Sequence, residues 1–170
     1  VERTEEYGRY GNPTQRSTER KLAGLEGTET ALLFSSGMAA VTTTLLALLQ
    51  QGDHAVFTND CYRKTRQFAS TVLAKMGVAF TMAAPALDAI EAAIQPNTRL
   101  VFSESPTNPF MNVLDLQGLG AMGRRHHVCT IIDSTFATPC NQRPAEFGID
   151  LHIHSATKYL GGHNDIPTGG

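Results

Sequence analysis

The chain has 170 residues, of which 41% are hydrophobic, and this is enough for one domain with a hydrophobic core. Its formal net charge of -2 gives no reason to expect binding to nucleic acid or to an anionic membrane surface. No apolar stretch approaches the roughly 20 residues of a membrane-spanning helix, and the largely charged residues 2–6 lack a signal-peptide core, so we expect a cytoplasmic protein with no membrane partner.

Short apolar runs alternate with longer stretches of helical pattern along the chain. The predicted strands are 31–34, 54–57, 78–82, 99–102, 128–132 and 151–153, and the predicted helices are 38–50, 61–76, 87–94 and 114–126. Gly77 and Pro96 stand where two of these helices should stop. Repeated strand–helix–strand units predict an α/β fold, with a mostly parallel sheet flanked by helices on both faces.

In sheets of this kind, ligands bind beyond the carboxyl ends of the strands. Ser36, Gly37 and Met38 follow the first predicted strand and open a helix. Free backbone N–H groups and the helix dipole favour an anion there, and Gly37 lets a ligand approach the backbone closely. Taken alone, this segment is more simply explained by an ordinary N-cap serine.

Two further residues follow other predicted strands. Tyr62 comes after the second strand and can stack on a flat ring, although a half-buried surface tyrosine is the ordinary alternative. Asn108 lies in a loop in which Pro106 and Pro109 restrict the backbone, so its amide can be held pointing inward. The alternative for this loop is a simple turn.

The last two predicted strands are followed by a carboxylate and an amine. Asp133 ends a run of largely apolar residues, and a buried carboxylate there needs a cationic partner such as a protonated ring nitrogen. Ser155, Thr157 and Lys158 follow the final strand. A lone lysine is usually a solvated surface group, but an amine with a lowered pKa can form a Schiff base.

An anion cradle, a stacking aromatic, a buried acid and an amine at one edge of one sheet are the parts that a pyridoxal-phosphate (PLP) site requires. The motifs Ser-Ser-Gly-Met, Ser-Pro-Thr-Asn-Pro, Asp-x-Thr-Phe-Ala-Thr-Pro and Ser-Ala-Thr-Lys-Tyr-Leu-Gly-Gly-His occur in this order along the chain. The chain thereby resembles the Cys/Met-metabolism PLP-dependent enzymes, over residues 7–165. Residues 61–66, 104–106 and 162–165 resemble the cystathionine γ-synthases of plants and cyanobacteria most.

The resemblance implies roles for residues of this chain. It implies that Lys158 forms the Schiff base with the cofactor, that Asp133 pairs with the ring nitrogen and that Tyr62 stacks on the ring and takes part in proton transfer. The cofactor-binding residues it implies are Ser36, Gly37, Met38, Tyr62, Asn108, Asp133, Thr135, Ser155, Thr157, Lys158, Tyr7 and Arg9.

The resemblance also implies an architecture. The fold expected is the large domain of aspartate-aminotransferase-like PLP enzymes, truncated, with residues 31–170 as the PLP-binding core and no C-terminal small domain, which in the family supplies an arginine for the substrate carboxylate. Residues 1–30 are expected to reach a neighbouring subunit, with Tyr7 and Arg9 touching the phosphate bound there. A homodimer or a dimer of dimers is therefore expected.

Three functions remain open. The first is γ-replacement on an activated homoserine ester by cysteine, which gives cystathionine. The second is a C–S lyase acting on cystathionine, methionine or cysteine. The third is a non-catalytic, truncated paralogue that assembles with a full-length partner. Small amino acids are the expected substrates, and neither nucleic acid nor membranes are expected as partners.

No metal site is expected. His152 and His154 would share one face of a strand, with His163 a possible third ligand, but no carboxylate or cysteine stands at ligand spacing nearby in the sequence. The three cysteines are odd in number and form no Cys-x-x-Cys pair, so we expect reduced thiols.

Overall fold

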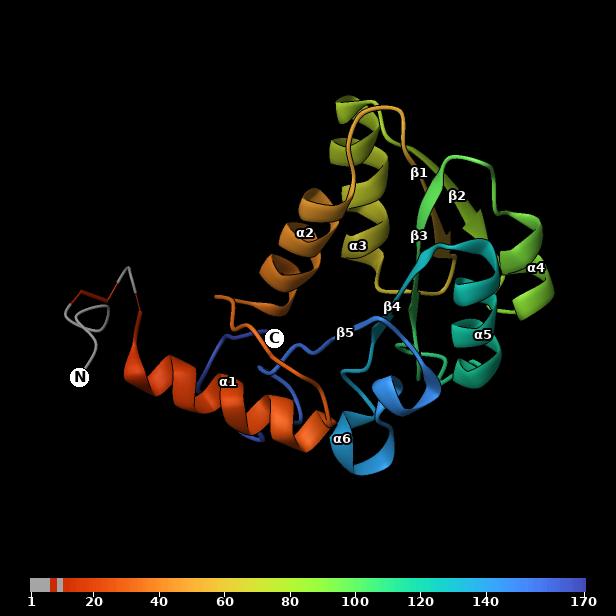
Figure 1. The fold of residues 1–170 in the computed structure, drawn as a ribbon. Helices are drawn as coiled ribbons and strands as arrows, with labels where there is room; N and C mark the ends of the chain where they lie inside the picture. The colour runs from red at the N-terminus through yellow and green to blue at the C-terminus, as the bar shows by residue number, and fades with distance from the viewer. Residues whose placement is uncertain (1–6, 9–10) are drawn as a thin grey trace.

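The computed structural model describes residues 7, 8 and 11–170 of the chain, and its centre is a five-stranded parallel sheet. The strands are β1 (His54–Thr58), β2 (Ala79–Ala83), β3 (Thr98–Glu104), β4 (Cys129–Asp133) and β5 (Leu151–Ile153). Their spatial order is β2-β1-β3-β4-β5, and each neighbouring pair is parallel (Figure 1). The predicted α/β fold with a parallel sheet is confirmed.

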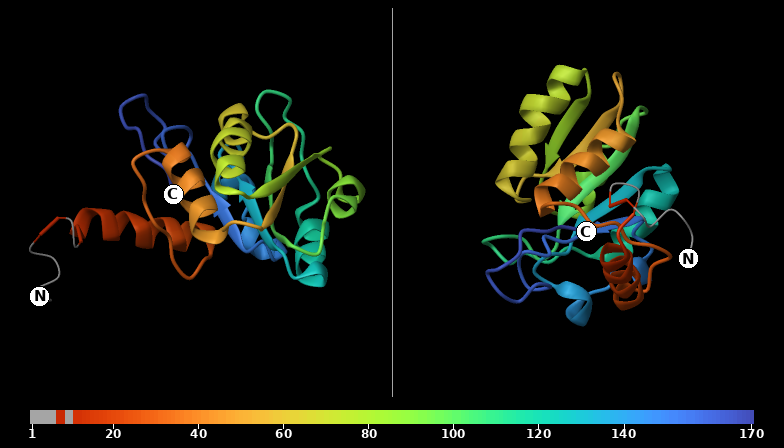
Figure 2. Two further views of the ribbon diagram at one scale, coloured as in Figure 1. Left: turned by 90° about the horizontal axis from the view of Figure 1, so that it is seen from above. Right: turned by 90° about the vertical axis from the view of Figure 1, so that its left-hand side faces the viewer.

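Helices cover both faces of this sheet (Figures 1 and 2). The α-helices are α1 (Pro13–Glu26), α2 (Gly37–Leu48), α3 (Arg63–Phe68), α4 (Leu87–Ala92), α5 (Leu116–His126) and α6 (Thr138–Asn141). A π-helical turn at Ala69–Leu73 and a 3₁₀ turn at Ala74–Met76 continue α3, and a second 3₁₀ turn spans Pro144–Phe147. None of the helices among the described residues is long and apolar enough to cross a membrane.

The core consists of two apolar clusters, one on each face of the sheet. Alternate residues of a strand point to opposite faces, so Phe57 packs with the α2 and α3 side and Val56 with the α4 and α5 side. All five residues of β1 are buried, as expected for a parallel strand covered on both sides. Cys61 lies in the first cluster, and all three cysteines are free.

The prediction of a strand at 31–34 is wrong. In this segment only Phe34 makes a bridge, antiparallel to Gly169, with backbone N–O distances of 2.7 and 3.1 Å. Gly170 in turn exchanges two backbone hydrogen bonds with His154, just after β5. An apolar run becomes a strand only if it finds a ladder partner, and residues 31–33 have none in the described part of the chain.

Helix α1 was not predicted from the sequence. Asn12 caps it, accepting hydrogen bonds from the N–H groups of Thr14 and Gln15, and Pro13 occupies its first position. Gly27, with a φ of 69°, ends it in the left-handed conformation that glycine adopts freely. The helix projects from the body of the domain, and only its C-terminal end approaches β5 (Figures 1 and 2).

Candidate functional site

The residues predicted from the strand ends do gather at the carboxyl edge of the sheet. Tyr62 follows β1 and is the N-cap residue of α3, while Asp133 is the last residue of β4. Glu104, the last residue of β3, pairs in register with Asp133. Lys158 lies in the turn after β5. Parallel pairing places these positions on one edge because all the strands run in the same direction.

The N-terminus of α2 forms a cradle beside the segment that follows β5. Ser36 caps the helix by accepting a hydrogen bond from the Ala39 N–H at 3.0 Å. A Cβ added to Gly37 would lie only 2.7 Å from the Cβ of Ser155. The backbone of α2 is therefore so close to Ser155 that no side chain fits at position 37. The first N–H groups of a helix, here those of Gly37 and Met38, have no partner within the helix. This cradle suits the phosphate of a ligand.

Asp133 is oriented by Thr135. The Oδ1 of Asp133 accepts hydrogen bonds from the Thr135 N–H at 3.1 Å and from its hydroxyl at 2.5 Å. The same hydroxyl accepts the Ser155 N–H at 2.8 Å. Thr135 therefore connects Asp133 with Ser155 of the cradle through hydrogen bonds. Its hydroxyl is used in these bonds within the protein.

Burial raises the pKa of Asp133 above its ordinary value, and the hydrogen bonds from Thr135 and the charge of His154 lower it only in part. A carboxylate in this environment is stabilised by a cation placed against it. This is the environment that the sequence predicted for a partner of a protonated ring nitrogen.

Tyr62 and Asn108 stand at the exposed side of the same edge. The Tyr62 side chain is 42% exposed, and Asn108 is exposed in the loop after β3. The peptide bonds before Pro106 and Pro109 in this loop are cis. Glu104 lies buried beneath both residues and was not predicted as a site residue from the sequence. Glu104 ends β3, and Lys158 follows β5, two strands away in the sheet. The local sequence pattern does not show that the two residues share an edge of the sheet.

Thr157 and Lys158 lie in a turn closed by backbone hydrogen bonds. The Lys158 N–H donates to the Ser155 carbonyl at 2.9 Å, and the Lys158 side chain is exposed. The Thr157 hydroxyl donates to the Thr168 carbonyl at 3.1 Å and accepts the Thr168 N–H at 2.9 Å. Thr157 therefore ties the turn to the last residues of the chain as well as standing near the cradle.

The remaining predicted contacts concern the N-terminal segment. Tyr7 is exposed, with 56% of its surface accessible. Arg9 lies outside the described residues. The expectation that Tyr7 and Arg9 reach a neighbouring subunit therefore stays a prediction.

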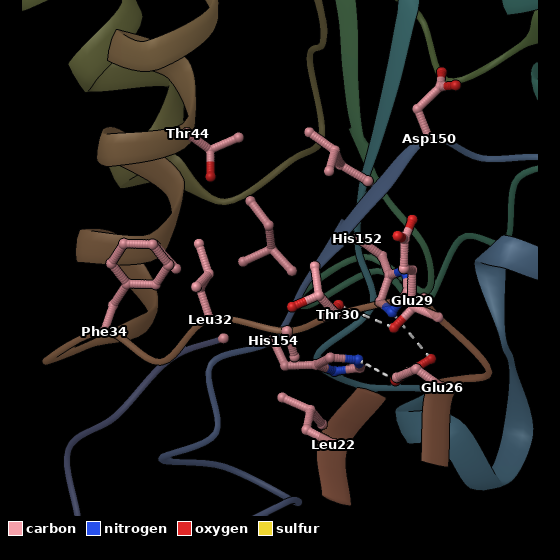
Figure 3. Close-up of a pocket in the computed structure, with 16 residues that line it drawn as sticks. Leu22, Glu26, Glu29, Thr30, Leu32, Phe34, Thr44, Asp150, His152 and His154 are labelled. Atoms are coloured by element: carbon pink, nitrogen blue, oxygen red, sulfur yellow. Dashed lines mark hydrogen bonds and ion pairs between the residues drawn. The ribbon is translucent and has the colours of Figure 1, made fainter. Parts of the chain in front are cut away.

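A cavity of about 340 Å³ lies elsewhere, between α1, residues 28–34 and β5 (Figure 3). None of the predicted cofactor residues lines it. Glu26, His152 and His154 do, with Glu26 Oε1 at 2.5 Å from His154 Nε2 and Glu26 Oε2 at 3.2 Å from His152 Nε2. The side-chain oxygen and nitrogen atoms of these three residues that could bind a metal lie within 4.8 Å of one another. The sequence shows no acid near the two histidines, but the fold brings Glu26 of α1 to them. We interpret the group as buried ion pairs that fasten α1 to β5.

Comparison with known proteins identifies the chain's relatives. The model of the Cys/Met metabolism PLP-dependent enzymes matches residues 2–170. The chain belongs to this family. The predicted resemblance is thus confirmed, and so is the cofactor, because the members of the Cys/Met metabolism family are PLP-dependent.

Several members of the family cover nearly all of the chain. It is 51% identical to the chloroplastic cystathionine γ-synthase 1 of Nicotiana tabacum and 48% identical to that of Arabidopsis thaliana, each over 96% of the chain. It is 43% identical to the L-methionine γ-lyase of Pseudomonas putida, also over 96%. The crystal structure of metB from Corynebacterium glutamicum superimposes with a TM-score of 0.96 and 37% identity over 99% of the chain.

The chain spans only part of the length of these relatives. It covers 31% and 30% of the two plant enzymes, and 44% of the solved metB chain. The fold of this part is that of the PLP-dependent family, which confirms the predicted α/β large-domain architecture.

The described residues fit PLP. The close approach of Gly37 to Ser155 leaves backbone N–H groups and a hydroxyl for its phosphate, and Asp133 is a partly buried acid whose raised pKa favours a cationic neighbour. Tyr62 supplies an exposed ring at the same edge, and Lys158 supplies the amine.

Proposed function

We propose that the protein catalyses γ-replacement, in which the thiol of cysteine displaces the γ-leaving group of an activated homoserine ester to give cystathionine. The observation that carries this proposal is the identity of about half to two plant cystathionine γ-synthases over 96% of the chain. The matches to a cystathionine β-lyase of Staphylococcus haemolyticus and to the methionine γ-lyase are lower, at 41% and 43%.

Bound PLP supplies an electron sink that stabilises negative charge on the substrate's α-carbon. In this proposal Lys158 would hold the cofactor through Nζ, and the same atom would accept the α-proton of the substrate. Asp133, held by Thr135, keeps a proton on the ring nitrogen. Tyr62 stacks on the ring and assists removal of a proton from the incoming amine or thiol. Gly37, Met38, Ser36, Ser155 and Thr157 surround the phosphate, and Asn108 lies beside the ring.

The first experiment tests the cofactor's anchor. Purified protein is reduced with borohydride in the presence of PLP, digested and searched by mass spectrometry for a pyridoxyl-lysine. The label should lie on Lys158 and disappear, together with the visible absorption band, in Lys158→Ala. Lys75→Ala, which removes an exposed lysine away from the site, should keep both. A label that stays in Lys158→Ala would contradict the assignment.

The second candidate is a C–S lyase, and the methionine γ-lyase and cystathionine β-lyase relatives are the observation in its favour. An assay with an activated homoserine ester and cysteine separates the two functions. Formation of cystathionine supports replacement, whereas release of a keto acid from cystathionine or methionine without a second substrate supports the lyase. No reaction from a protein that binds PLP would favour the third candidate, a paralogue that acts as an assembly partner.

We further propose that residues 1–30 reach a neighbouring subunit and that Tyr7 and Arg9 touch the phosphate bound there, in a homodimer or a dimer of dimers. Residues 31–170 would form the PLP-binding core, and a small domain would supply the group that binds the substrate carboxylate. The cytoplasm is the compartment we propose. The chloroplast named for both plant relatives is the alternative, which localisation of the tagged protein would distinguish.

A further inference from the structure

Glu104 is a buried carboxyl group at the site, and none of the roles above uses it. It is only 5% exposed, ends β3 and stands opposite Asp133 in the pairing of β3 with β4. Its Oε1 accepts the N–H of Asn108 at 3.1 Å, whereas its Oε2 is buried without a hydrogen-bond partner. A buried carboxyl oxygen without a partner is costly to the fold, so its retention calls for an explanation.

Two segments that carry ring-side residues converge on this carboxyl group. Asn108 donates its N–H from the loop after β3. The backbone N–H of Tyr62, from the loop after β1, favours the ionised form of the same carboxyl group, but it makes no hydrogen bond to it. Further out, Asn112 Nδ2 donates to Asp60 Oδ2 at 3.0 Å, so a second link joins the same two loops nearer the solvent.

We propose that Glu104 is a positioning residue, whose buried carboxyl group holds the Tyr62 backbone and the Asn108 loop in fixed relation to Asp133. The proposal rests on the proposed use of Tyr62 and Asn108 beside the PLP ring. Glu104 itself does not touch the ring in this proposal; it acts through the two segments that do.

The charge state of Glu104 defines the conservative substitution. Burial raises the pKa of Glu104 to about 8, with the charge on Asp133 adding to the effect and the N–H groups of Tyr62 and Asn108 opposing it. At neutral pH the carboxyl group is therefore largely protonated and neutral. Gln keeps the shape, the neutral charge and the carbonyl acceptor, so Glu104→Gln should preserve the positioning.

Hydrogen exchange in the full-length protein, without PLP, tests the proposal directly. In Glu104→Ala, peptides that cover residues 60–66 and 105–113 should exchange about tenfold faster than in the wild type, because the second segment loses the acceptor of the Asn108 N–H and the first loses the buried carboxyl group that its backbone faces. In Glu104→Gln both should exchange at the wild-type rate. Asp53→Ala is the matched control, because Asp53 is a buried acid paired with Arg99 at the opposite end of β1 and β3, and it should leave both peptides unchanged.

Equilibrium binding of PLP, followed by its visible band, provides the second measurement. Affinity should fall about tenfold in Glu104→Ala and stay near the wild-type value in Glu104→Gln and Asp53→Ala. If Glu104→Ala does not fold, Glu104→Asp, which withdraws the carboxyl group by one methylene, serves in its place. Unchanged exchange in both peptides, or equal damage by Gln and Ala, would overturn the proposal.

The two proposals can fail separately. A wild-type protein that is not labelled by PLP at Lys158 would contradict the proposed function and leave the exchange result intact. A wild-type protein labelled at Lys158, with exchange unaffected by Glu104→Ala, would contradict the role of Glu104 alone.

Discussion

Gly37 at the start of α2 and Ser155 after β5 lie so close that a Cβ on Gly37 would be 2.7 Å from the Ser155 Cβ and 2.9 Å from its Cα. Real Cβ atoms almost never come this close to another atom, and the Cα of Ser155 cannot rotate away. The separation between α2 and the segment after β5 is therefore fixed by the absence of a side chain at position 37, and the proposed phosphate cradle depends on that separation.

Gly37→Ala should push α2 away from Ser155 and weaken PLP binding by about tenfold or more, as expected when phosphate hydrogen bonds are lengthened. Binding is measured by titration of the cofactor's visible band. Gly24→Ala is the control, because no atom lies within 4 Å of the position of its added Cβ. It should raise stability by about 0.5–1 kcal/mol, since Ala favours a helix over Gly, and leave binding unchanged. Equal binding by Gly37→Ala and the wild type would contradict the cradle.

Thr135→Val removes the hydroxyl that donates to Asp133 and accepts from the Ser155 N–H. Two partly buried groups each lose a hydrogen bond, so the free energy of unfolding should fall by about 1–3 kcal/mol, and the affinity for PLP should fall with it. Urea denaturation and PLP titration provide the two measurements. Thr18→Val, which removes an exposed hydroxyl on α1, should change stability by less than about 0.5 kcal/mol. A Thr135→Val protein as stable as Thr18→Val would show that the connection is energetically unimportant.

Glu26 should make the fold sensitive to acid. Burial by itself raises the pKa of Glu26, but the hydrogen bonds and charges of His152 and His154 outweigh it and lower the pKa to about 2. Between about pH 5 and 2 the unfolded chain therefore binds more protons than the folded one at this residue. The stabilisation is complete above about pH 5 and is lost as the pH falls towards 2.

Glu26→Ala should lower the free energy of unfolding at pH 7 by about 3–5 kcal/mol, because it leaves the buried His154 and the partly buried His152 without their acid. Glu26→Gln should flatten the decline of stability between pH 5 and 3. Denaturant titrations over this range measure both effects. Glu146→Gln is the control, because Glu146 is an exposed acid on the 3₁₀ turn. Glu19 would not serve, because it accepts a hydrogen bond from the Leu33 N–H. An acid profile of Glu26→Gln that matches the wild type would contradict the ion-pair interpretation.

Glu104 should have the opposite effect to Glu26 on the pH dependence of stability, and at higher pH. Its folded-state pKa of about 8 lies above its ordinary value of 4.5. The folded chain thus binds more protons at this residue between those values, and the stability of the cofactor-free protein should decline as the pH rises through this range and level off above about pH 8. Glu104→Gln cannot ionise, so its stability relative to the wild type should increase from pH 5 to pH 9. Urea denaturation at pH 5, 7 and 9 tests this, and a constant difference would contradict it.

Local patterns in the sequence predicted much of the sheet and the site. Each of β1, β2, β3, β4 and β5 lies where an apolar run was noted, and Tyr62, Asp133 and Lys158 follow strands as predicted. The run at 31–34 looks the same in sequence, yet it is no strand, because strand formation depends on a hydrogen-bonding partner that composition does not encode.

By itself, the sequence determined the class of fold, the five strands of the sheet and the candidates for the acid, the amine and the helix start at the site, because hydrophobic periodicity and capping residues act over a few positions of the chain. Only the tertiary structure decided which of these groups meet. It placed Glu104 beside Asp133, Gly37 against Ser155 and Glu26 between His152 and His154. Such contacts join positions far apart in the chain, so they depend on how the strands order themselves and how the helices pack on them, which no local pattern specifies.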